Sequence, residues 1–168
     1  MLSLKFYPTL GSDFSKLFKQ NINTQSYARM LMIRGYYIDT AIWRDLHENR
    51  KDKSKNIGEL AFELFVKIRF NKEKVLYSDL VVEELLRAYN EQTIEKLFKN
   101  VSVLLEKADI NETQVKEAVT LSNELKIPFG DALHGILARD SNAVMVTRDR
   151  HFRKLKDKII IKKPEDLS

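Results

Sequence analysis

Three aspartates stand where a strand pattern ends or a helix pattern begins. Asp39 follows the run Tyr36–Ile38, Asp149 lies just past the apolar run Val144–Val146, and Asp131 is at the start of an amphipathic helix pattern. In open α/β sheets, ligands bind outside the carboxyl ends of the strands. These positions therefore predict an acidic crevice at one edge of a sheet.

A pair of glutamates, Glu83 and Glu84, falls in the second turn of the helix that Ser78 is expected to cap, and could reach the same crevice. Carboxylates a few ångströms apart raise each other's pKa and resist joint ionisation. A hard divalent cation relieves that repulsion, and oxygen ligands suit Mg²⁺ or Mn²⁺. The simpler interpretation of the Asp39–Thr40 pair is a helix N-cap, which taken alone is the favoured one.

Apolar periodicity indicates the elements that position these residues. Short apolar runs alternate with amphipathic patterns, which is typical of an α/β domain with a mostly parallel sheet of about four or five strands between two helical layers. Asn111 and Gln114 form a capping-box pattern. Strands are predicted at Tyr36–Thr40, Val75–Tyr77, Val144–Val146 and Ile159–Ile161, and helices at Ile57–Ile68, after Ser78, and at Thr93–Glu106, Val115–Leu125 and Asp131–Ala138.

Composition narrows the class of protein. The chain has 168 residues, of which 43% are hydrophobic, enough for one domain with a core. Cysteine is absent, which excludes disulfides and thiolate zinc sites. No apolar run approaches the length of a membrane span and no signal-peptide pattern opens the chain, so we expect a cytoplasmic protein without a membrane partner.

Positive charge is concentrated beside Asp149. Between Arg148 and Lys163 there are eight basic residues against two acidic ones, more than the net +5 of the whole chain. A solvated surface is the ordinary explanation of such a run. Next to an acidic crevice, it also suits contacts with nucleic-acid phosphates.

Three blocks in this order resemble the PIN domain, the fold of metal-dependent ribonucleases that includes VapC-type toxins. They are Tyr-Tyr-Ile-Asp-Thr ending at Thr40, Ser-Asp-Leu-Val-Val-Glu-Glu-Leu-Leu beginning at Ser78, and Asp-Ala-Leu-His-Gly-Ile-Leu-Ala beginning at Asp131 and followed by Val-Thr-Arg-Asp-Arg-His-Phe. The resemblance covers about Ile33 to Leu167. It favours Glu84 over Glu83, because the family places a glutamate directly before a leucine.

The resemblance implies roles for these residues. The implied metal ligands and catalytic residues are Asp39, Glu84, Asp131 and Asp149, binding Mg²⁺ or Mn²⁺. Thr40 and Thr147 would orient carboxylates or a metal-bound water. His134 and His151 are interpreted as structural, because the metal supplies the nucleophile. The expected RNA-binding residues are Arg148, Arg150, Arg153 and Lys154.

The implied function is a metal-dependent endoribonuclease acting on single-stranded RNA, expected to be the toxin of a type II toxin–antitoxin pair. Its expected partners are a cognate antitoxin and a second copy of the chain. The alternative is a PIN-like RNA-binding or RNA-processing assembly protein. A phospho-accepting receiver domain also places an aspartate at a strand end, but the chain has no clear strand-end lysine to complete it.

Residues 1–32 are outside the resemblance, and residues 33–168 are expected to form the nuclease domain. The first segment is interpreted as an arm, a partner-binding extension or vector-derived sequence.

Overall fold

The computed structural model describes residues 33–52 and 55–167. At its centre is a five-stranded, all-parallel sheet in the order β3-β2-β1-β4-β5, which confirms the predicted α/β class. The predicted extension over residues 1–32 lies outside the described residues and stays a prediction. The strands are β1 (Gly35–Ile38), β2 (Lys74–Tyr77), β3 (Leu105–Lys107), β4 (Ala143–Val146) and β5 (Ile161–Lys162).

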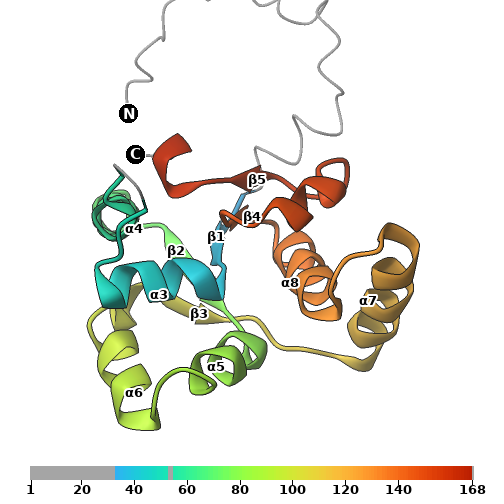
Figure 1. The fold of residues 1–168 in the computed structure, drawn as a ribbon, viewed down its shortest axis with the longest axis horizontal. Coiled ribbons are helices and arrows are strands. Elements are labelled where there is room, and N and C mark those ends of the chain that lie inside the picture. The colour runs from blue at the N-terminus through green and yellow to red at the C-terminus, as the bar shows by residue number, and fades with distance from the viewer. Residues whose placement is uncertain (1–32, 53–54, 168) are drawn as a thin grey trace, which may run out of the picture. The chain divides into compact units, whose positions relative to one another are not determined.

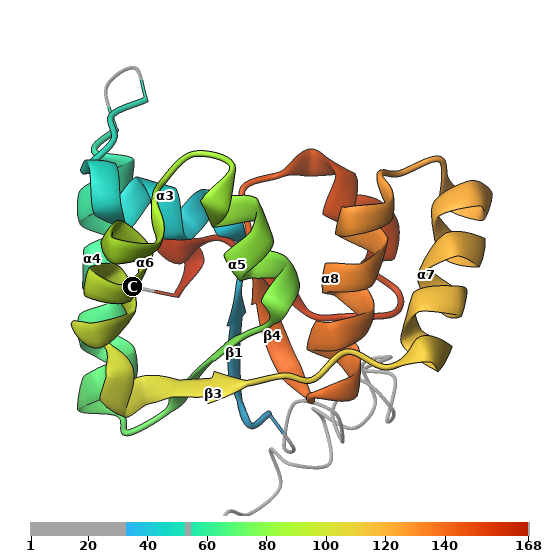
Figure 2. The same ribbon diagram turned by 90° about the horizontal axis from the view of Figure 1, so that it is seen from below.

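Helices cover both faces of this sheet (Figures 1 and 2). Figure 1 shows α3, α4 and α6 on one side of the strands and α8, with α7 outside it, on the other. Short 3₁₀ turns occupy Ser102–Leu104, Arg150–Leu155 and Pro164–Asp166. The α-helices are α3 (Thr40–Glu48), α4 (Ile57–Phe70), α5 (Asp79–Leu86), α6 (Glu91–Lys99), α7 (Glu112–Leu125) and α8 (Phe129–Asp140).

Side-chain patterning explains these layers. In α4, the buried residues Ala61, Leu64 and Ile68 recur at helical spacing and face the core. All four residues of β4 are buried, as expected of a parallel strand covered on both faces. The capping box predicted from Asn111 and Gln114 is present at the start of α7. Among the described residues, no helix is long and apolar enough to cross a membrane.

The strand order creates a switch point between β1 and β4. From β1 the chain moves to β2 and β3 on one side, and then returns to β4 and β5 on the other. Ile38 pairs with Val146, so the next residues, Asp39 and Thr147, meet at the same edge of the sheet. Crevices at such switch points are the usual ligand sites of open α/β sheets.

The prediction of one helix over Thr93–Glu106 was wrong. Helix α6 ends at Lys99, and Leu105–Lys107 form the edge strand β3 beside β2. Two of the three residues of β3 are exposed and Leu105 is half-buried. The sequence of β3 therefore lacks the apolar pattern that marks a strand. Backbone pairing with β2 decides its conformation instead.

Two strand boundaries also differ from the predictions. The first strand ends at Ile38, and Thr40 already belongs to α3. The last strand was predicted at Ile159–Ile161, whereas β5 consists of Ile161 and Lys162.

Candidate active site

Asp39 stands at the carboxyl end of β1 and is buried, with 8% of its surface exposed. It occupies the N-cap position of α3, but its side chain makes no capping hydrogen bond, which overturns the simple N-cap interpretation. Its Oδ2 instead accepts a hydrogen bond from Thr147 Oγ1 at 2.5 Å. The carboxylate is therefore held toward the end of β4, where it lies in one group with Glu84 and His134.

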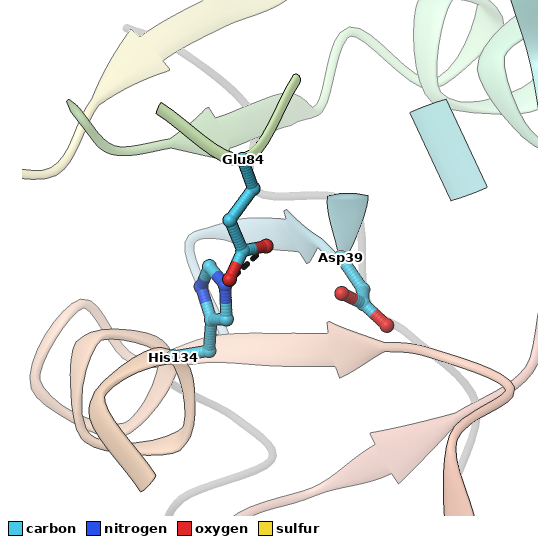
Figure 3. Close-up of side chains that lie close together, drawn as sticks. All are labelled: Asp39, Glu84 and His134. Atoms are coloured by element: carbon cyan, nitrogen blue, oxygen red, sulfur yellow. Dashed lines mark hydrogen bonds and ion pairs between the residues drawn. The ribbon is translucent and has the colours of Figure 1, made fainter. Parts of the chain in front are cut away.

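Glu84 reaches the same region from α5. Its Oε2 accepts a hydrogen bond from Thr40 Oγ1 at 2.6 Å and lies 3.2 Å from His134 Nε2. Figure 3 shows Asp39, Glu84 and His134 gathered from three different elements, with the Glu84 carboxylate against the imidazole ring. Glu83 is exposed, and no hydrogen bond joins it to the site among the described residues. Of the two glutamates, Glu84 is thus the one that lies beside Asp39 and His134.

Close packing brings Glu84 next to the start of α8. A Cβ added to Gly130 would lie 3.3 Å from Glu84 Oε1, which is tighter than ordinary van der Waals contact. A glycine immediately before Asp131 therefore leaves room for the Glu84 carboxylate at the start of α8.

Asp131 and Asp149 form a second acidic group around His151. His151 Nδ1 lies 3.0 Å from Asp131 Oδ2 and 3.4 Å from Asp149 Oδ1. The backbone N–H of His151 also donates to Asp149 Oδ1, and the N–H of Asp149 donates to Thr147 Oγ1. Thr147 thus contacts both acidic groups, because it bonds Asp39 with its hydroxyl hydrogen and receives the N–H of Asp149.

The electrostatics of the crevice oppose full ionisation. Burial raises the pKa of Asp39, and the nearby carboxylates Glu84 and Asp131 raise it further against the lowering effects of His134 and Thr147. Burial and the charge of Asp149 raise the pKa of Asp131. The crevice therefore favours protons or a cation over bare carboxylates.

Glu84 behaves differently from its neighbours. Burial raises its pKa, but hydrogen bonds from His134 and Thr40, with the charges of His134 and Arg87, outweigh that effect and hold the pKa below its usual value. Glu84 is thus the carboxylate of the site best kept in its ionised form.

The predicted cluster of four carboxylates is divided into two groups, each with a histidine. In each group the potential ligand atoms lie within 4.8 Å of one another: Asp39 with Glu84 and His134, and Asp131 with Asp149 and His151. Sequence analysis missed the contact of His134 with Glu84. Its signal was the spacing of three residues between Asp131 and His134, which places both on one helix face.

The predicted RNA-binding residues differ in their surroundings. Arg150 and Arg153 are exposed and form no ion pair within the described part of the chain. Lys154 Nζ donates to the backbone oxygens of Leu125 and Lys126 at the end of α7.

Arg148 is already engaged inside the protein. Its Nε lies 3.3 Å from Asp45 Oδ2, and its Nη1 contacts the carboxylate of Glu165. Its side chain is 19% exposed. These contacts connect the segment after β4 to α3 and to the C-terminal 3₁₀ turn, so they give Arg148 a structural role that the charge pattern did not predict.

Comparisons with known proteins agree with the fold. A chain in the crystal structure of VapBC2 from Rickettsia felis bound to a DNA fragment from their promoter superposes with a TM-score of 0.58 at 18% identity, over 76% of this chain and 97% of that one. No curated protein is significantly similar in sequence. The family model of the PIN domain matches residues 36–158, which contain β2 to β4, all of β1 except Gly35, and all four predicted acidic residues. With this match over most of its length, the chain belongs to the PIN domain family.

Proposed function

We propose that this protein is a metal-dependent endoribonuclease that cleaves single-stranded RNA, and that it is the toxin of a type II toxin–antitoxin pair. The observation that carries the proposal is the acidic site at the switch point, where Asp39 and Glu84 lie in one group of potential ligands and Asp131 and Asp149 in another. Membership of the PIN domain family and the likeness to a VapBC2 structure support the same activity.

The chemistry of these residues fits a hard divalent ion. The two groups offer carboxylate oxygens, and one oxygen of each of Asp39 and Glu84 is held by a threonine hydroxyl. The other oxygen of each carboxylate has no hydrogen-bond donor among the described residues, so it is available as a ligand. When bound, Mg²⁺ or Mn²⁺ would offset the mutual repulsion and supply an acidified water and positive charge for a phosphodiester.

The protein's own residues would divide the remaining work. Asp39, Glu84, Asp131 and Asp149 would hold the ion, while Thr40 and Thr147 keep carboxylate oxygens in place. Arg150 and Arg153 lie one and four residues after Asp149, and their exposed guanidinium groups would contact the phosphates that flank the cleaved bond. Lys154 would add to the field of this basic surface.

The test is cleavage of single-stranded RNA by wild type and Asp131→Asn. Asparagine keeps the shape and an acceptor for His151 but removes the charge, so we expect activity to fall by at least about 100-fold with the fold intact. Asp140→Asn, at the opposite end of the same helix, is the matched control. Activity should stop with a chelator and return with Mn²⁺. Equal cleavage by Asp131→Asn and wild type would refute the proposal and leave an RNA-binding or assembly role.

A groove beside the C-terminal end of α3 is the surface that we propose for the antitoxin. It has a volume of about 600 Å³ and lies between α3, α4 and α6, with Phe65, Leu97 and Leu104 among its lining residues. Phe62 and Val66 line it and are 59% and 51% exposed. Arg69 and Lys96 also line it, so we propose an antitoxin segment with apolar side chains and flanking acidic residues. Homodimerisation, expected from the family resemblance, remains a further proposal.

A further inference from the structure

A continuous chain of buried hydrogen bonds lies behind Glu84. Ser78 Oγ is 2.6 Å from Tyr37 Oη, Tyr37 Oη is 3.0 Å from His134 Nδ1, and His134 Nε2 is 3.2 Å from Glu84 Oε2. Ser78 and Tyr37 are fully buried and His134 is 2% exposed. These hydrogen bonds connect β1, the end of β2 and α8 to a carboxylate of α5.

The chemistry of the partners assigns a direction to each bond. An ionised carboxylate only accepts, so His134 Nε2 must carry the proton that faces Glu84. With the single ring proton of this tautomer on Nε2, Nδ1 accepts a hydrogen bond from the Tyr37 hydroxyl. The Tyr37 oxygen in turn accepts from Ser78. Every donor in the chain therefore points toward Glu84, and each of these buried polar groups has a partner.

The two oxygens of Glu84 are used differently as a result. Oε2 receives both Thr40 and His134, whereas Oε1 receives no hydrogen bond from the described residues. Two donors from different elements on one oxygen fix the rotation of the carboxylate. Oε1 is thus the oxygen left for a cation.

We propose that His134 and Tyr37 are positioning residues that orient Glu84 for metal binding, with Ser78 as the origin of the chain. This inference rests on the proposed metal-dependent function. It assigns to His134 a definite tautomer, with the proton on Nε2, and a definite task that differs from acid–base catalysis.

A direct metal ligand is the opposing role for His134, since its ring nitrogen lies with Asp39 and Glu84 in one group of potential ligands. That role needs an unprotonated Nε2 and therefore the loss of the bond to Glu84. Nδ1 would then carry the proton and donate to Tyr37, which would donate to Ser78. The two roles thus predict opposite tautomers.

Nitrogen-15 NMR of the imidazole rings distinguishes them without RNA or metal. We expect His134, identified by the loss of its signals in His134→Gln, to show a protonated Nε2 and an unprotonated Nδ1. The same tautomer should persist when Mg²⁺ is added. An unprotonated Nε2 with the proton on Nδ1, in either state, would overturn the proposal.

Measurements of metal affinity test whether these hydrogen bonds position Glu84. Tyr37→Phe removes only the hydroxyl, and we expect Mn²⁺ affinity, measured by titration calorimetry, to fall about 10-fold, as is typical when a partner of a metal ligand is lost. Tyr36→Phe is the matched control, because Tyr36 is the neighbour in β1 and its hydroxyl bonds Glu73 instead. Ser78→Ala removes the distal end of the chain and serves if Tyr37→Phe does not fold.

The outcomes separate this inference from the proposed function. Equal Mn²⁺ affinities in Tyr37→Phe and Tyr36→Phe, or in Ser78→Ala and wild type, would overturn the positioning role. His134→Gln, whose amide can replace the Nε2 donor, should bind Mn²⁺ more tightly than His134→Ala. A protein that shows these differences but cleaves no RNA would refute only the ribonuclease proposal.

Discussion

Replacement of Arg148 by alanine should weaken folding more than it weakens RNA binding. The Asp45 side chain is only 3% exposed and has two partners, with Arg50 Nη1 at 3.2 Å from Oδ1 and Arg148 Nε at 3.3 Å from Oδ2. Arg148 also contacts Glu165. Arg148→Ala would leave one oxygen of a buried carboxylate without its partner and would release the C-terminal turn.

The magnitude follows from the surroundings of Asp45. Removing one partner of a buried ion pair costs about 3 to 5 kcal/mol. Arg50 remains on the other oxygen, and Arg148 is itself partly exposed, so we place the loss near the lower end, at about 3 kcal/mol. For a chain of this size that corresponds to a decrease in Tm of about 6 to 12 °C.

Thermal unfolding and RNA titration should be measured together on Arg148→Ala and Arg150→Ala. Arg150 is exposed and carries the same charge two residues away, so its loss should leave Tm unchanged. It should instead weaken RNA binding and reduce the salt dependence by about one unit of slope. Asp45→Asn in the Arg148→Ala background should recover stability, because the buried negative charge that lost Arg148 is removed.

The pH dependence supplies a second check. Burial raises the pKa of Asp45 despite the lowering effects of Arg148 and Arg50. Without Arg148 that pKa rises further, so the folded state binds the proton more tightly than the unfolded state does. Stability of the variant is then lost as pH rises through the folded pKa, and its deficit should shrink in acid. A variant with wild-type Tm and RNA affinity reduced as in Arg150→Ala would refute the structural role.

Two further predictions concern the crevice and the groove. Asp39→Asn should raise metal-free stability at neutral pH by about 0.5 to 2 kcal/mol, because burial raises the pKa of Asp39 and its ionised form costs stability as pH rises through that value. Unfolding scans should show this gain disappearing in acid and Mn²⁺ stabilising only wild type; a variant less stable than wild type would contradict it. Phe62→Asp should reduce binding of the proposed antitoxin by about 30-fold or more, while RNA cleavage is kept. Val119→Asp, an exposed apolar position on α7 outside the groove, is the control, and equal binding by both variants would exclude the groove.

The sequence by itself determined the α/β fold class and the positions of three of the four acidic residues of the site. Buried parallel strands read as continuous apolar runs, so β1 and β4 were visible, and with them Asp39 and Asp149 at their carboxyl ends. Asp131 was visible because amphipathic periodicity marks where α8 begins. These signals are local, and local periodicity can be recognised in a single sequence.

Tertiary structure alone decided which neighbours these residues meet. The family resemblance already favoured Glu84 over Glu83, but only the tertiary structure shows that Glu84 meets His134, 50 residues away. In the sequence Arg148 belongs to a basic run. In the fold its guanidinium group donates to Asp45, more than 100 residues earlier. A side chain's partner depends on the crossing of elements far apart in the chain. Hydrophobic patterning places those elements on a sheet but does not choose the polar contacts at its edge.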